Sequence, residues 1–191
     1  MRKVALFCGS FNPIHIGHLA LCSYVAEFCD VDEVRFVVSP QNPFKVNVDL
    51  LDDDLRLEMV KRAVQGFPKF TVSDVEFSLP KPSYTYVTLQ HLSESEPDAQ
   101  FILMMGGDNL DAFRKWKNYE WIMKNYPIWV YSRLGSSNQI PSDFVNFTLL
   151  KTPIIEISST FIRNSIADNK NVDYFLHPAV SAYIKVNGLY K

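Results

Sequence analysis

A short apolar run followed by a loop of small residues begins the chain. Residues 4–8 (VALFC) form a continuous apolar stretch, which is typical of a strand that is buried on both faces. Residues 9–18 (GSFNPIHIGH) place glycine and proline in the connection, and a helical pattern begins at Gly17. Backbone N–H groups and the positive end of a helix dipole meet where such a loop enters a helix. The segment therefore predicts a strand, a loop and a helix that together bind phosphate groups.

The alternation of apolar runs and helical patterns continues along the chain. Strands that are apolar throughout and separated by helices are typical of a parallel sheet with both faces covered, joined by right-handed crossovers. We therefore expect an α/β fold: a doubly wound, mostly parallel, Rossmann-like sheet of about five or six strands with helices on both faces. The expected strands are 4–8, 34–38, 70–72, 101–105 and 128–131, and the expected helices are 17–29, from 52–54 onward, 85–92, from 158 onward, and 178–186.

The length of 191 residues suits one domain with a substantial core. We expect a single domain over 1–191, whose C-terminal helices at about 158–191 pack on the sheet and complete the site. Ligands of such sheets bind beyond the carboxyl ends of the strands. The 9–18 loop and the turn at 106–108 (GGD) both follow expected strands, so we expect them to face one crevice.

Composition excludes some classes of partner. The formal net charge is −2, so there is no global attraction to nucleic acid or to an acidic membrane. No apolar run is long enough for a membrane span, and the chain start lacks a secretory signal pattern. Cys8, Cys22 and Cys29 show no metal-ligand spacing. We expect a cytoplasmic protein that binds no nucleic acid and no membrane, and the sequence leaves self-association open.

Two histidines and an arginine suggest chemistry at phosphate. His15 and His18 flank the start of the first helix, and Arg163 follows a second helix start, ISSTFIR at 157–163. A lone histidine more often packs in a turn, but the pair beside this loop favours a functional role. An adjoining phosphate favours the cationic form of imidazole, which neutralises charge during phosphoryl transfer. No serine, cysteine or lysine is poised beside a base as a nucleophile, so positioning and charge neutralisation are the expected means of catalysis.

These segments resemble the signatures of the nucleotidyltransferase superfamily. Within it the chain is most similar, over residues 4–190, to the bacterial nicotinate mononucleotide adenylyltransferases. The resemblance implies transfer of AMP from ATP to nicotinate mononucleotide by direct in-line displacement, forming nicotinate adenine dinucleotide and pyrophosphate in NAD biosynthesis. NAD is then a pathway product and no cofactor, and Mg²⁺ arrives with ATP. Three further segments carry the resemblance: PSYTYVTL at 82–89, GGDNLDAFRKW at 106–116, and the tail around 176–178, 183–184 and 188–190.

The resemblance also implies roles for individual residues. His15, His18 and Arg163 are the expected catalytic residues. Lys45 matches a family lysine on the phosphates, although Phe44 stands where many relatives carry histidine. We expect no metal site in the protein itself. The residues expected to bind ATP are Gly9, Ser10, Phe11, His15, His18, Gly106, Asp108, Ser158, Ser159 and Arg163, and those expected to bind nicotinate mononucleotide are Thr85, Trp116 and Arg133.

Other functions share parts of this pattern. Phosphopantetheine adenylyltransferase uses the same two signatures, but the segments around Thr85 and Trp116 disfavour it. A fragment of a class I aminoacyl-tRNA synthetase shares the HIGH motif, but it needs a lysine-rich second motif and a tRNA-binding domain. A non-catalytic nucleotide sensor with this fold stays an alternative, although His15, His18 and Arg163 are all retained.

Overall fold

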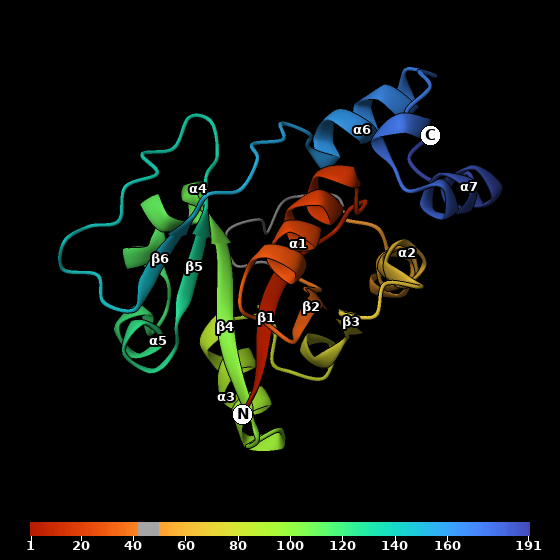
Figure 1. Ribbon diagram of the computed structural model, residues 1–191. Helices are drawn as coiled ribbons and strands as arrows, with labels where there is room; N and C mark the ends of the chain where they lie inside the picture. Colours follow the sequence, from red (N-terminus) through yellow and green to blue (C-terminus); the bar gives the residue numbers. More distant parts are fainter. Residues whose placement is uncertain (42–49) are drawn as a thin grey trace.

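The computed structural model describes residues 1–41 and 50–191 (Figure 1). Its centre is a six-stranded sheet in the order β3-β2-β1-β4-β5-β6, and every neighbouring pair is parallel. The predicted α/β, doubly wound, parallel sheet is therefore confirmed. Lys45 and Phe44 lie outside the described residues. The strands are β1 (Arg2–Gly9), β2 (Glu33–Val38), β3 (Phe70–Ser73), β4 (Ala99–Gly106), β5 (Ile128–Tyr131) and β6 (Phe147–Leu150).

Helices connect the strands. Each predicted helix is present, with its start at or near the expected residue. The α-helices are α1 (Ile16–Phe28), α2 (Asp53–Val64), α3 (Thr85–Ser95), α4 (Gly107–Asp111), α5 (Tyr119–Asn125), α6 (Ser159–Ala167) and α7 (Pro178–Asn187), and the short 3₁₀ helices are η1 (Val75–Phe77), η2 (Phe113–Lys115) and η3 (Asp173–Phe175). None of the helices within the described ranges has the length and apolar character that crossing a bilayer requires.

Side chains of the central strands alternate between two hydrophobic cores. Along β1, Ala5 and Phe7 face a core shared with α1, α2, α6 and α7. Val4 and Leu6 face the opposite core, which includes α3 and α5. This alternation explains why the strand reads as continuously apolar, because both of its faces are buried.

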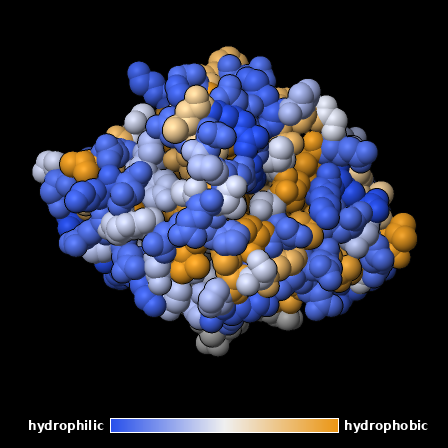
Figure 2. Space-filling model, turned by 90° about the horizontal axis from the view of Figure 1, so that it is seen from below, coloured by the Kyte–Doolittle hydropathy of each residue, from blue (hydrophilic) through white to orange (hydrophobic). Residues whose placement is uncertain are grey.

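The C-terminal helices α6 and α7 belong to the core on the α1 face of the sheet. α7 packs against α2, and Figure 1 shows α6 and α7 beyond the amino end of α1. Ile162 of α6 is fully buried in the core of the α1 face. Seen from below, the surface is mostly hydrophilic with interspersed hydrophobic residues (Figure 2).

The strand order reverses between β1 and β4. β1 is followed in sequence by β2 on one side, and it pairs with β4 on the other. Its carboxyl end at Gly9 therefore lies beside the end of β4 at Gly106. Such a switch point leaves a crevice for ligands.

The short strand β6 and helix α5 are absent from the elements predicted from sequence. β6 is an edge strand of four residues, of which Thr148 and Leu149 are exposed. An exposed edge strand lacks the continuous apolar run that identified the inner strands. α5 has only seven residues, too few for a clear helical period.

Candidate active site

The loop after β1 has a tight, asymmetric backbone. Phe11 adopts the left-handed conformation with φ 45°, and its ring is almost fully buried. A Cβ on Gly9 would lie 3.0 Å from that ring, a closer approach than side chains tolerate. Glycine at position 9 therefore lets the buried phenylalanine fold back beneath the end of β1.

The two histidines lie against each other at the start of α1. Their ring centroids are 3.7 Å apart with planes inclined by 21°. The N–H of His15 donates to Nδ1 of His18 over 3.3 Å. A Cβ on Gly17 would lie 3.1 Å from the His15 ring, so glycine at this position leaves room for the stack.

His15 is neutral in the unliganded protein. Its side chain is buried, and Nδ1 has no hydrogen-bond partner among the described residues. Burial, followed by the positive charge of Arg133, lowers the pKa of His15 to about 4. The sequence predicts a cationic imidazole beside phosphate. Without a phosphate neighbour, desolvation favours the uncharged ring. A neutral imidazole still offers a hydrogen bond to a phosphate oxygen.

The start of α6 docks on this loop from the far end of the chain. Arg163 donates from Nη1 to the carbonyl oxygen of Asn12 over 2.9 Å. The hydroxyl of Ser159 donates to the carbonyl oxygen of Pro13 over 2.8 Å. Ser158 caps the helix by accepting from the N–H of Phe161. The second motif thus lies directly on the first.

His15, His18 and Arg163 line one cavity of about 340 Å³. Most of the residues predicted to bind ATP face the same cavity; Gly106 is not among those that line it. The predicted residues in its wall are Gly9, Ser10, Phe11, His15, His18, Asp108, Ser158, Ser159 and Arg163, together with Arg133.

Asp108 and Arg133 close one side of this cavity. Arg133 Nε lies 3.6 Å from Asp108 Oδ1. A Cβ on Gly107 would collide with the Asn138 side chain, which in turn holds the backbone of Arg133. Gly107 therefore allows the loop after β5 to approach the end of β4 closely.

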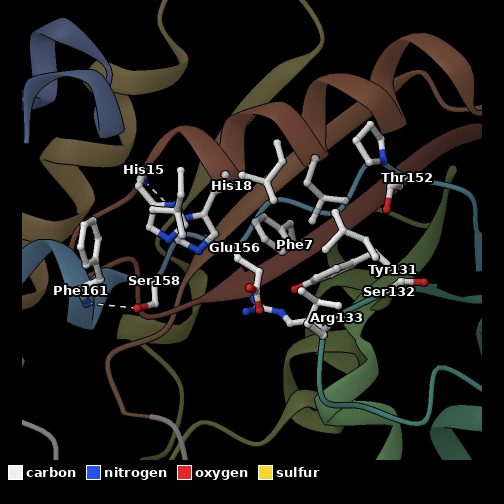
Figure 3. Close-up of a pocket in the computed structure, with 17 residues that line it drawn as sticks. Phe7, His15, His18, Tyr131, Ser132, Arg133, Thr152, Glu156, Ser158 and Phe161 are labelled. Atoms are coloured by element: carbon white, nitrogen blue, oxygen red, sulfur yellow. Dashed lines mark hydrogen bonds between the residues drawn. The ribbon is translucent and has the colours of Figure 1, made fainter.

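A second cavity, of about 360 Å³, continues from the histidines along α1 (Figure 3). His15 and His18 lie at one end, and Tyr131, Ser132 and Thr152 lie at the other. Residues 152–157, which connect β6 to α6, form much of its wall. Its size suits a heterocyclic base beside the phosphate cavity.

The third cavity, of about 370 Å³, lies on the other side of β4. Thr85 and Trp116, two residues predicted to bind the mononucleotide, line it, and the third, Arg133, is not among its lining residues. Three buried polar atoms in its wall have no partner among the described residues: Glu76 Oε2, Ser83 Oγ and Trp116 Nε1. Burial raises the pKa of Glu76, against the effect of its hydrogen bond from Thr88.

Tyr131 lines all three cavities, and it is not among the site residues predicted from the sequence. It ends β5 and is nearly buried. Burial raises the pKa of its hydroxyl, so the side chain is a neutral phenol. Its place at the carboxyl end of a strand was the available signal, because that is where ligands of such sheets bind.

The sequence is similar to those of known proteins. The model of the cytidylyltransferase-like family matches residues 6–165. A probable nicotinate-nucleotide adenylyltransferase of Flavobacterium johnsoniae is 47% identical over 191 residues, covering 99% of each chain. The chain belongs to the nicotinate-nucleotide adenylyltransferase family. A member from Bacteroides fragilis is 50% identical over 181 residues, covering 93% of this chain and 89% of its own.

Solved structures of adenylyltransferases share the fold. A nicotinic acid mononucleotide adenylyltransferase of Plasmodium falciparum, complexed with NaAD, matches with a TM-score of 0.82 at 20% identity. The match covers 100% of this chain and 98% of that chain. At this identity the match supports the doubly wound architecture of the family.

The side chains of the site in this adenylyltransferase include few metal ligands. Over residues 1–41 and 50–191, no group of three or more His, Cys, Asp and Glu side chains could hold a metal ion. Among the described residues that line the phosphate cavity, Asp108 is the acidic one, and it faces Arg133. This donor set suits a metal ion that is held mainly by nucleotide phosphates and water.

Proposed function

We propose that this protein transfers AMP from ATP to nicotinate mononucleotide, forming nicotinate adenine dinucleotide and pyrophosphate. The observation that carries the proposal is the cavity where His15, His18 and Arg163 meet, adjoining the cavity of Trp116. Cys8, Asn109 and Tyr131 line both. An acceptor phosphate at this boundary can attack the α-phosphorus of ATP in line, with no covalent enzyme intermediate.

The phosphate cavity supplies the charge stabilisation. His18 hydrogen-bonds the oxygens of the reacting phosphorus, and His15 donates to a neighbouring phosphate as a neutral imidazole. Backbone N–H groups of the loop at 9–11 bind the same polyanion. Arg163 donates one N–H to Asn12 and another to the Thr160 hydroxyl. The donors that remain bind the triphosphate together with the Ser158 and Ser159 hydroxyls.

The adenosine and the mononucleotide occupy the flanking cavities. Asp108 accepts hydrogen bonds from ribose hydroxyls, and Gly106 leaves room for the Asp108 carboxylate, with which a Cβ at position 106 would collide. Trp116 stacks on the pyridine ring, and Thr85 presents backbone groups to its carboxylate. We place Arg133 between Asp108 and the histidines, where the phosphates of the two substrates meet.

Mg²⁺ is proposed to enter with ATP and to neutralise phosphate charge when bound. Asp108 supplies a carboxylate to the phosphate cavity, and carboxylates are common Mg²⁺ ligands. Because Asp108 pairs with Arg133, we propose that it contacts the ion through water. Lys45 is proposed as a phosphate contact from its sequence position alone. We further propose a cytoplasmic enzyme built as one domain, in keeping with its three free cysteines.

A substrate comparison tests the proposal. The purified protein is incubated with ATP, Mg²⁺ and one acceptor, and the adenylylated product is identified by mass spectrometry. We expect product with nicotinate mononucleotide and much less with nicotinamide mononucleotide or phosphopantetheine. Pyrophosphate release with phosphopantetheine alone would identify the rival adenylyltransferase, and ATP binding without release would identify a sensor.

A further inference from the structure

Arg56 of α2 is a fully buried arginine that none of the three cavities includes in its wall. Its five N–H donors are all engaged. Nη1 donates to the carbonyl oxygens of Ser10 over 2.6 Å and Ser39 over 2.8 Å. Nε donates to the carbonyl oxygen of Leu51 over 2.9 Å. Nη2 donates to Asp53 over 2.5 Å and to the carbonyl oxygen of Pro40 over 3.4 Å.

Burying a guanidinium is unfavourable unless its charge and donors are satisfied. Asp53 is the one carboxylate that pairs with Arg56 among the described residues, and it also pairs with the exposed Lys81. A hydrophobic side chain would fill a helix–sheet interface without this requirement. The arginine instead gathers carbonyl groups from the loop after β1, the end of β2 and the start of α2.

The carbonyl groups of the loop after β1 are bound outside the cavity. The carbonyl of Gly9 accepts from the N–H of Ser39 over 2.9 Å, and that of Ser10 accepts from Arg56. In a trans peptide the N–H points opposite to the C=O. The N–H groups of Ser10 and Phe11 are therefore directed away from β2 and Arg56, on the side where Ser10 and Phe11 line the phosphate cavity.

We propose that Arg56 is a positioning residue for adenylyl transfer, which orients the backbone N–H groups of the phosphate loop by binding the Ser10 carbonyl. The proposal rests on the proposed function, because it takes the polyanion in this cavity to be ATP. Arg56 acts from below the loop and touches no substrate. Its effect falls mainly on the ATP side of the site, since the carbonyl that it binds in the phosphate loop belongs to Ser10. Of its partners only Ser39 lines the cavity of Trp116, and Arg56 binds the backbone carbonyl of that residue.

Arg56→Lys tests this role, because one ammonium group cannot span the carbonyls that the guanidinium joins. The matched control is Arg35→Lys in β2. Arg35 is 9% exposed and pairs with Glu33 and Glu96 near the other end of the sheet. Both variants lose a buried guanidinium, but only Arg56 contacts the phosphate loop.

Three quantities are measured: the thermal midpoint, the Kd of a non-hydrolysable ATP analogue, and kcat and KM for each substrate. For Arg56→Lys we expect the Kd of the analogue to rise and kcat to fall, each by about 10- to 100-fold, with KM for the mononucleotide within about threefold. Arg35→Lys should lower the thermal midpoint and leave the Kd of the analogue and kcat near the wild-type values. The proposal would be overturned if folded Arg56→Lys kept the wild-type Kd and kcat, or if binding of the mononucleotide were weakened as much as binding of ATP.

A second pair of variants decides the matter if Arg56→Lys does not fold. Asp53→Asn removes the carboxylate that anchors Arg56, and Lys81→Gln removes the other partner of Asp53. We expect Asp53→Asn to weaken binding of the ATP analogue about threefold or more and Lys81→Gln to leave it unchanged; equal effects would count against the proposal. Analogue binding needs no acceptor, so a wild-type protein that forms no dinucleotide would refute the proposed function without deciding the role of Arg56.

Discussion

An N–H of Arg163 donates to the carbonyl oxygen of Asn12 over 2.9 Å, although the two residues are 151 positions apart. The contact joins the second motif to the loop of the first and brings guanidinium and imidazole groups to one cavity. Cationic and neutral donors from opposite ends of the chain thus face one cavity. Preorganised donors of this kind stabilise developing charge without reorganising during the reaction.

Arg163→Lys should reduce kcat/KM for ATP by about 100-fold, because lysine lacks the planar fork that binds Asn12 and phosphate together. KM for the mononucleotide should change little. Steady-state kinetics with each substrate varied in turn measures both effects. Arg62→Lys is the control, since Arg62 lies on α2, pairs with Glu58 and stacks over Tyr183. A similar loss in that variant would mean that the effect is not specific to the site.

His18→Ala should lower kcat by about 100- to 1,000-fold, the usual effect of removing one donor to developing charge. The fold should be retained, since His18 is partly exposed and its ring borders the cavity. Single-turnover rates and circular dichroism separate the two effects. His91→Ala, at an exposed position of α3, is the control. Turnover at the wild-type rate in His18→Ala would show that His18 does not stabilise the reacting phosphate.

The sequence predicted the inner strands and the two motifs because each carries a local pattern. Val4–Cys8 is apolar throughout, and the histidine pair follows a loop with glycine and proline. Arg56 has no such signal. It reads as one charged residue of an amphipathic helix, and its partners are backbone carbonyls that only the fold brings together.

Burial and side-chain direction were likewise beyond the sequence. The neutral state of His15 follows from its desolvation, which depends on tertiary packing. Its place after a strand predicts Arg133 as a contact to the phosphate of the mononucleotide, but the sequence does not predict that its side chain faces Asp108 in the phosphate cavity. Which side of the sheet a residue after a strand faces depends on the loop, here held by Asn138.

His15 should make stability depend on pH between about 6.5 and 4. The pKa of His15 is lowered from 6.5 to about 4 in the folded protein, so the unfolded chain binds more protons in this window. The contribution to stability is fully present above the unfolded value and is lost as the pH falls, by about 3 kcal/mol in total. Urea unfolding of wild type and His15→Asn at pH 7 and pH 5 measures it. The free energy of unfolding of the wild type, relative to that of His15→Asn, should fall between pH 7 and pH 5. The free energy of unfolding of His91→Asn should change with pH as that of the wild type does.

Trp116→Ala should raise KM for the mononucleotide about 5- to 100-fold and leave KM for ATP nearly unchanged, because stacking on one ring contributes about 1–3 kcal/mol. Trp116 lines the cavity on the α3 side of β4, away from Arg163. The control is Trp121→Ala, in which a partly buried tryptophan packed on Tyr126 is removed from α5. Stability should fall in both variants, but only Trp116→Ala should lose acceptor binding. If instead the ATP constant rose and the acceptor constant held, the pyridine ring would have to lie elsewhere, and the cavity of Trp116 would belong to the adenosine.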